Sequence, residues 1–398
     1  MSKQEARRTK PVILVFVRYY LPGFRSGGPV RSVSNLVRAL DGEYDFRIVC
    51  LNRDHGETVP YSDVRPGQWT RLGEARVYYA TDREAGFALC RRMVRDIRPD
   101  MVYLNSLLDR EFSMKPFLAA RRGRGIPVLV APRGELSPGA LGLKARRKQL
   151  FLSLVRASRY YARVNWHASS TAEEERIRQV FAPPASRMFL ASNLPEMPQD
   201  SVSRTQAKQP GVLRIVLAAR ISPMKNTLAA IRMAGQLEGE VELDLWGPLE
   251  NREYWAACQQ QMLLCRSNVK VRYRGEVAHE QLHALLHGYD AMLLPTLGEN
   301  FGHSIIEALS AGLPVVISDR TPWRGLVDAG VGADVPLDNE PEFVRQLKRL
   351  QTMNDNEMQN VRAACVRYVT AWQAGNANLD VYRKMFNSVI ASRTTSCK

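Results

Sequence analysis

The sequence predicts an α/β protein with two domains, each a mostly parallel sheet flanked by helices. Strand-like apolar segments alternate with amphipathic segments of helical period on both sides of one polar stretch, residues 198–211. At 398 residues the chain is long enough for two ordinary domains. We expect a first domain at 1–197, a linker at 198–211, a second domain at 212–375, and a C-terminal helix at 376–398 that packs back towards the first domain.

The expected strands are short apolar segments bounded by turn residues. Residues 12–17 are all apolar, as in a strand buried on both faces of a parallel sheet. By the same criterion, strands are expected at 46–51, 76–80, 101–105, 127–131, 164–168, 213–218, 241–246, 269–274, 291–295 and 314–318.

Between these strands, apolar residues recur at helical spacing. The segment 30–40 follows a loop rich in Gly and Pro, and Ser170 with Glu173, or Thr171 with Glu174, fits a capping box for a helix at 172–180. The remaining helices are expected at 87–97, 112–122, 227–237, 253–265, 279–289, 304–311, 341–350, 356–370 and 379–390.

The positive charge of the chain is concentrated in its first half. Residues 1–200 hold 34 Lys and Arg against 20 Asp and Glu, whereas the remainder holds 22 against 20. This asymmetry indicates an anionic partner for the first half: a membrane surface, a phosphorylated lipid or nucleic acid. The six cysteines have no paired spacing, which favours a reducing cytoplasm, and no apolar run is long enough to span a membrane.

Two carboxylates flank a turn between a strand and a helix. Glu299 and Glu307 lie eight positions apart, and the segment Asn300-Phe301-Gly302 between them follows the strand at 291–294. Ligands of α/β sheets bind at the carboxyl ends of the strands, and backbone N–H groups at a helix start can hold a diphosphate. Carboxylates beside such N–H groups can accept hydrogen bonds from sugar hydroxyls.

Two further loops have the chemistry to bind phosphate. Arg220 and Lys225 follow the strand at 213–218, and the pair Gly27-Gly28 lies in the loop after the first strand. Arg and Lys match phosphate oxygens, and glycine lets a backbone approach a ligand closely. The pattern G-x-G-x-x-G is absent, so a dinucleotide site of the usual dehydrogenase type is not supported.

With these motifs the chain resembles the retaining GT-B glycosyltransferases of family 4, also called group 1. Glu299-x7-Glu307 matches the E-x7-E element, Arg220 with Lys225 matches the donor-diphosphate loop, and Gly27-Gly28 looks like the N-terminal glycine loop. The segment 131–140 is similar to the corresponding segment of enzymes that build bacterial exopolysaccharide, capsule or O-antigen. The resemblance implies the GT-B architecture, two Rossmann-like domains that face each other across a cleft.

The resemblance also implies a nucleotide-sugar donor, UDP- or GDP-linked, and no metal. Arg220 and Lys225 would neutralise the diphosphate leaving group, Glu299 would contact the transferred hexose, and these three form the expected catalytic set. Glu307 would contact the ribose. The expected donor-binding residues are Gly27, Gly28, Arg220, Lys225, Asn300, Phe301, Gly302, His303, Ser304 and Glu307.

The first domain would receive the acceptor, a lipid-diphosphate-linked glycan or an oligosaccharide. Asn105, Arg133 and Glu135 are the expected acceptor or cleft residues. Many family members carry a His where this chain has Arg133, so no general base is named. The family then implies front-face displacement, in which the leaving phosphate helps to take the acceptor proton.

The basic amphipathic segment 143–164 fits attachment to an anionic membrane, and a core-packed helix with a basic outer face explains it equally well. We expect a cytoplasmic protein, peripheral at the inner face of the plasma membrane.

His279, His283 and His287 share one helix face, for which packing or solvation is favoured over metal binding. The alternative functions are a GT-B-like sugar-nucleotide epimerase and a basic nucleic-acid-binding protein. Nucleic acid is not expected as a partner, because no recognition motif is present.

Overall fold

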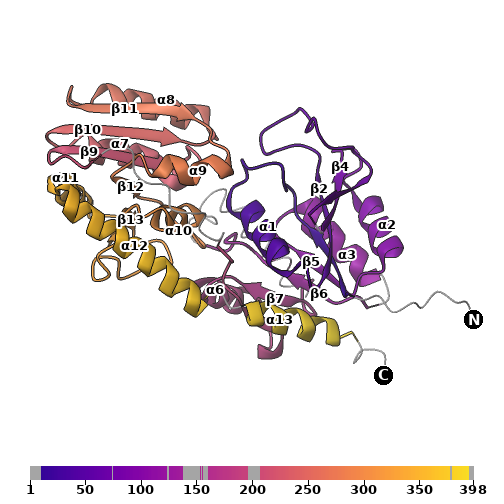
Figure 1. The fold of residues 1–398 in the computed structure, drawn as a ribbon. Helices are drawn as coiled ribbons and strands as arrows, with labels where there is room; N and C mark the ends of the chain where they lie inside the picture. The colour runs from indigo at the N-terminus through magenta and orange to yellow at the C-terminus, as the bar shows by residue number, and fades with distance from the viewer. Residues whose placement is uncertain are drawn as a thin grey trace, which may run out of the picture. The chain divides into compact units, whose positions relative to one another are not determined.

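The computed structural model describes residues 10–73, 75–122, 125–137, 153, 155, 160–195, 207–376 and 379–393. The chain divides into two compact units (Figure 1). The first unit runs to Leu194 and includes the last helix, α13 (Leu379–Ala391), whereas the second spans Pro195–Ala377.

The first unit is built on an eight-stranded sheet with the strand order β3-β4-β2-β1-β5-β6-β7-β8. All neighbours pair in parallel except β3 with β4. The strands are β1 (Val12–Phe16), β2 (Asp45–Leu51), β3 (Trp69–Leu72), β4 (Ala75–Ala80), β5 (Met101–Leu104), β6 (Val128–Val130), β7 (Asn165–Ala168) and β8 (Met188–Leu190). The sequence did not predict β3 or β8, because both are short edge strands that leave part of their residues exposed.

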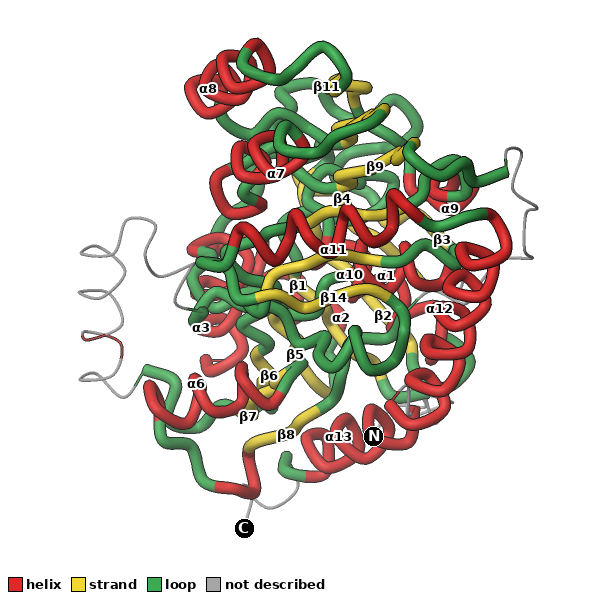
Figure 2. The backbone as a smooth tube through the Cα atoms, turned by 90° about the vertical axis from the view of Figure 1, so that its left-hand side faces the viewer, coloured by secondary structure: helices red, strands yellow, loops and turns green. Residues whose placement is uncertain are grey.

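Helices cover both faces of this sheet. They are α1 (Gly28–Leu40), α2 (Phe87–Ile97), α3 (Lys115–Arg122), α6 (Thr171–Phe181) and α13, and a π-helical turn (Arg110–Met114) precedes α3. Residues from α2, α3 and α6 share one apolar core with alternate positions of the central strands. On α13, Phe386 lies 6.4 Å from Phe46 of β2 and 5.9 Å from Tyr103 of β5, ring centre to ring centre. Figure 2 shows α13 alongside β8, where the Tyr382 hydroxyl donates to the Ser192 carbonyl.

Of the two capping alternatives, the structure has Ser170 as the N-cap of α6, and its hydroxyl accepts the N–H of Glu173. The Glu173 carboxylate accepts from the N–H and hydroxyl of Ser169 and from the N–H of Gly134. This buried carboxylate therefore ties the start of α6 to the loop that follows β6.

The second unit is built on a six-stranded parallel sheet in the order β11-β10-β9-β12-β13-β14. Its strands are β9 (Val212–Ala218), β10 (Glu240–Trp246), β11 (Val269–Gly275), β12 (Ala291–Leu294), β13 (Val315–Ser318) and β14 (Gly332–Val335). Its α-helices are α7 (Thr227–Ala234), α8 (Arg252–Leu263), α9 (His279–Leu286), α10 (His303–Ser310), α11 (Glu340–Thr352) and α12 (Asp355–Asn376). The edge strand β14 was not predicted, because it begins with Gly and only alternate residues are buried.

Both sheets reverse their strand order at one place, between β1 and β5 in the first unit and between β9 and β12 in the second. At such a switch point the connections leave in opposite directions and open a crevice beyond the carboxyl ends of the strands. The loop with Arg220 and Lys225 follows β9, and the loop with Glu299 follows β12. The strand order therefore brings two separate sequence motifs to one switch point.

Most of the predicted linker and of the basic segment 143–164 lies outside the described residues, so the membrane-attachment prediction for that segment is not addressed by the structure. In the described part of the chain, no helix has both the length and the apolar character needed to cross a bilayer.

On α9 and just after it, the rings of His283 and His287 meet edge to face, with their centres 5.0 Å apart, and desolvation lowers the pKa of His287.

Candidate functional site

The loop after β9 is held against the end of β10. The N–H of Ala219 donates to the Trp246 carbonyl and the N–H of Ile221 to the Pro248 carbonyl, each at 2.9 Å. Gly247 permits this close approach: its φ is +140°, and a Cβ there would lie 2.1 Å from the carbonyl oxygen of Ala219. Arg220 is thereby fixed between two bonded backbone positions.

The loop after β12 is held against the loop after β9. The N–H of Leu297 and the hydroxyl of Thr296 both donate to the carbonyl of Met224, at 2.8 and 3.0 Å. Thr296 is fully buried, and its own carbonyl accepts from the Ser318 hydroxyl at 2.6 Å. These bonds fix the segment that leads to Glu299.

Each predicted phosphate-binding cation is paired with a carboxylate. Lys225 forms an ion pair with Glu299, and only 15% and 11% of the two side chains are exposed. Arg220 donates to Glu250 at 3.0 Å, with 33% and 38% exposed. Glu250 was not singled out from the sequence, although it follows β10, the strand beside β9, and that position is the signal that could have identified it.

The turn before α10 is fixed by glycine and by aromatic packing. Gly302 caps the helix with a φ of +80°, and a Cβ there would lie 2.8 Å from Cδ1 of Ile305. Phe301 is buried beside the rings of Trp323, Trp372 and His303, and its carbonyl accepts from Nε1 of Trp323 at 2.6 Å. The Phe301 side chain therefore belongs to the core, which leaves the backbone as its means of contacting a ligand.

The start of α10 directs backbone N–H groups out of the helix. The first N–H groups of a helix have no acceptor within it, and the helix dipole adds positive potential. His303 and Ser304 occupy these positions, Asn300 lies in the preceding turn, and Glu307 lies half-buried in the next helical turn. With Lys225 and Arg220 on the neighbouring loop, the switch point of the second unit combines anion-binding groups with carboxylates that can accept from hydroxyls.

Gly27 and Gly28 belong to the first unit, whereas the other expected donor-binding residues belong to the second. Gly27 caps α1 with a φ of +64°. The preceding turn is held by Asp54, which is buried and accepts from the N–H groups of Phe24 and Arg25 at 2.8 and 3.1 Å. Sequence reasoning missed Asp54, which lies just beyond β2.

The three expected acceptor residues lie at the carboxyl ends of β5 and β6. Glu135 accepts from the Ser106 hydroxyl at 2.7 Å and from the next two backbone N–H groups, and burial raises its pKa. Its carboxylate therefore holds the loop after β5. Asn105 and Arg133 contact each other directly, because Nε and Nη2 of Arg133 donate to Oδ1 of Asn105 at 3.1 and 2.8 Å.

Arg133 also contacts residues that the sequence did not single out. Its Nη1 donates to Oδ1 of Asn193, and its Nη2 donates to the Tyr103 hydroxyl at 2.7 Å. That hydroxyl lies 2.7 Å from Nδ1 of His167, a fully buried residue of β7. His167 sits in a predicted strand, so no sequence pattern distinguished it from an ordinary core residue.

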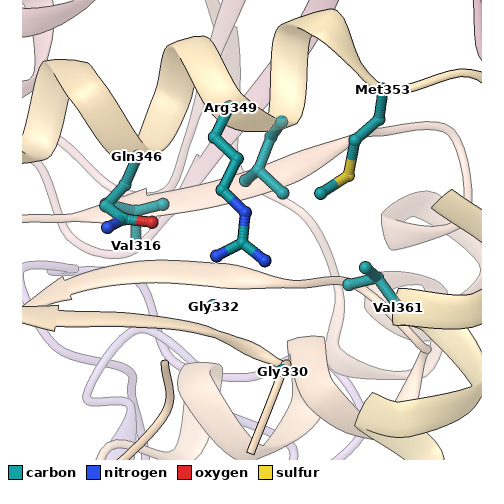
Figure 3. A pocket seen from close by; sticks show the side chains of 8 residues that line it. Val316, Gly330, Gly332, Gln346, Arg349, Met353 and Val361 are labelled. Carbon is teal, nitrogen blue, oxygen red and sulfur yellow. The ribbon is translucent and has the colours of Figure 1, made fainter. Parts of the chain in front are cut away.

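A small cavity elsewhere in the second unit lies beneath α11, as Figure 3 shows. It is lined by Val316, Gly330, Gly332, Gln346, Arg349, Leu350, Met353 and Val361. None of the predicted site residues lines it, so it has no part in the site at the switch point.

Family models match both halves of the chain. One described as "Glycosyl transferase 4-like domain" matches residues 27–193, and one described as "Glycosyl transferases group 1" matches residues 199–368. All the expected site residues lie within these two ranges.

Two curated relatives match over 104 residues, a stretch that covers 26% of this chain and 27% of each relative. The O-antigen chain mannosyltransferase B of Escherichia coli is 34% identical there, and the GDP-mannose:cellobiosyl-diphosphopolyprenol alpha-mannosyltransferase of Xanthomonas oryzae is 31% identical. Among solved structures, sucrose-phosphate synthase from Thermosynechococcus elongatus superposes with a TM-score of 0.68 at 16% identity, covering 95% of this chain and all of that chain. This last likeness concerns the fold.

Proposed function

Because the chain belongs to the group 1 glycosyltransferases of GT-B fold, we propose that it is a retaining hexosyltransferase with a UDP- or GDP-linked donor. The proposed acceptor is a lipid-linked glycan of bacterial surface polysaccharide synthesis. The observation that carries the donor half is the placement of Arg220, Lys225 and Glu299 on neighbouring loops at the switch point of the second sheet, where Lys225 pairs with Glu299.

In this mechanism Arg220 and Lys225 stabilise the negative charge that develops on the departing diphosphate. Such stabilisation contributes several kcal/mol when donors aim at developing charge in a site that excludes water. The N–H groups at the start of α10 add to the same field. Glu299 accepts from hydroxyls of the transferred sugar, and Glu307 from those of the ribose. No metal takes part, and the leaving phosphate helps to take the acceptor proton.

The lipid-linked acceptor is supported by two observations. The relative from Xanthomonas oryzae is named for a diphosphopolyprenol acceptor, and the one from Escherichia coli for an O-antigen chain. The first 200 residues also carry the positive excess that favours an anionic surface. We therefore place the enzyme at the inner face of the plasma membrane.

A thermal-shift screen against UDP-, GDP-, ADP- and TDP-sugars tests the donor site. A ligand that binds only the folded protein raises its melting temperature. We expect one UDP- or GDP-sugar to do so, and expect Lys225→Ala and Glu307→Ala to abolish the shift. Lys270→Ala is the matched control, because Lys270 is exposed on β11 of the same unit. The proposal fails if no sugar nucleotide shifts the wild-type protein, or if both site variants keep the shift.

Transfer to acceptor is tested with the donor that the screen identifies. The full-length protein is incubated with that donor and a polyprenyl-diphosphate-linked disaccharide, and the new linkage is read by NMR. We expect an elongated lipid product with the anomeric configuration of the donor. An inverted linkage would refute retention, and release of an epimerised sugar without elongation would favour the epimerase.

A further inference from the structure

Among the residues that the structure describes, Arg133 is a cation without a carboxylate partner. In the described part of the chain, its guanidinium donates to uncharged oxygens, those of Asn105, Asn193 and Tyr103. Among the described residues no Asp or Glu oxygen lies within ion-pair distance of Arg133. Glu173, on α6, directs its two oxygens to the backbone of Gly134 and to Ser169. A guanidinium held by neutral oxygens keeps its positive charge available to an anion.

The hydrogen-bond directions around Arg133 keep the rest of the network uncharged. Arginine only donates, so the Tyr103 oxygen accepts from Nη2 and its proton goes to Nδ1 of His167. His167 must then carry its proton on Nε2, which donates to the Ala191 carbonyl at 2.8 Å. Burial, and then the charge of Arg133, lower the pKa of His167 to about 3. This buried chain therefore orients Arg133 without neutralising it.

Asn105 supplies a second donor that has no acceptor. Its Oδ1 takes both bonds from Arg133, which sets the orientation of the carboxamide. Its Nδ2 is buried, with no hydrogen-bond partner in the part of the chain that the structure describes, and the residue is 4% exposed. Buried donors in native proteins nearly always have a partner. An N–H donor beside an unneutralised guanidinium matches an anionic oxygen.

The backbone at Arg133 supports a functional role for this position. Arg133 has a φ of +54°, in the left-handed region that residues other than Gly, Asn and Asp seldom adopt. Such strain is retained where the surroundings fix a residue for function. Asn105 follows β5, which flanks the switch point of the first sheet, and Arg133 follows β6 beside it.

We propose that Arg133 and Asn105 form a binding site for a phosphate or diphosphate group in the first unit. The assignment of this group to the acceptor rests on the proposed function. The anion site itself is independent of the proposed function. The donor diphosphate and free inorganic phosphates share this chemistry, so the experiment separates these sources.

Binding of inorganic pyrophosphate to the full-length protein tests the site by isothermal titration. All variants carry Lys225→Ala, so that the donor loop contributes little. We expect Arg133→Gln and Asn105→Asp each to weaken binding of pyrophosphate at least tenfold. Arg133→Gln removes the cation. Asn105→Asp replaces the carboxamide with a carboxylate of nearly the same shape, which neutralises the guanidinium. Arg91→Gln, which removes an exposed charge on α2 of the same unit, is expected to change binding less than twofold.

Equal affinities of Arg133→Gln and Arg91→Gln, or undiminished binding by Asn105→Asp, would overturn the proposal. An absence of pyrophosphate binding by the Lys225→Ala protein would also overturn it. Asn105→Asp serves as the test if Arg133→Gln does not fold. Failure of the sugar-nucleotide screen together with Arg133-dependent pyrophosphate binding would reject the proposed function and leave the anion site standing.

Kinetics with otherwise wild-type protein assign the source of the phosphate. If the group belongs to the acceptor, Arg133→Lys raises KM for a polyprenyl-diphosphate-linked acceptor about tenfold and leaves the donor KM unchanged. If the donor KM rises instead, the anion is the donor diphosphate and the acceptor assignment is wrong. A purely structural role would lower kcat or stability without separating the two KM values.

Discussion

The ion pair between Lys225 and Glu299 is expected to couple the two motifs of the second unit energetically. Lys225→Met and Glu299→Gln each remove one charge, and the double variant removes both. Two charges 4 Å apart attract by about 4 kcal/mol at an effective dielectric constant of about 20. Desolvation and side-chain ordering offset part of this attraction. Because only 15% and 11% of the side chains are exposed, we expect a coupling of about 1–3 kcal/mol in the free energy of unfolding.

The assay is urea unfolding of the four proteins, followed by tryptophan fluorescence, and a second cycle supplies the control. Arg220 and Glu250 form a pair of the same charge in the same unit, but 33% and 38% of their side chains are exposed. Exposed pairs are typically coupled by about 0.2–1 kcal/mol. A Lys225–Glu299 coupling no larger than that of Arg220–Glu250 would refute the conclusion that burial strengthens the pair.

Two further predictions concern stability alone. Gly247→Ala combines an unfavourable φ with a clash against the backbone of Ala219, so it should destabilise the protein by about 2–5 kcal/mol in urea unfolding. Gly275→Ala is the control, because Gly275 has a φ of +86° but open space around it, and a loss of about 1–2 kcal/mol is expected. Equal losses of stability in the two variants would refute the clash. His167 has a folded pKa of about 3, below its ordinary value, so the unfolded chain binds the extra proton and stability should fall by about 3–5 kcal/mol as the pH drops from about 6.5 to 3. His167→Gln should flatten that part of the pH profile, and an unchanged slope would show that other groups cause it.

The sequence was sufficient for the central strands and for the loops that follow them. The apolar segments that form β9 and β12 stand out clearly from the polar residues around them. Because Arg220 and Glu299 follow these segments in the chain, they are placed at the carboxyl ends of the strands. The strands that were missed, β3, β8 and β14, are edge strands of three or four residues. Segments so short and partly polar carry little periodic signal.

The contacts within the sites could not be predicted, because they depend on which strands are neighbours. Lys225 meets Glu299 only because β9 lies beside β12 and Thr296 bonds to the loop before α7. Likewise, the approach of His167 to Arg133 requires the adjacent order of β5, β6 and β7. Residue spacing along the chain contains neither fact.

The inclusion of α13 in the first unit has a consequence for how the chain is synthesised. Phe386 packs against Tyr103, and the Tyr382 ring lies 5.5 Å from that of His167, so the last helix covers the residues that orient Arg133. On the ribosome, the entire second unit emerges before these aromatic residues do. The first unit therefore keeps an uncovered apolar face until the second unit has been translated, and its arginine network is completed only when α13 follows.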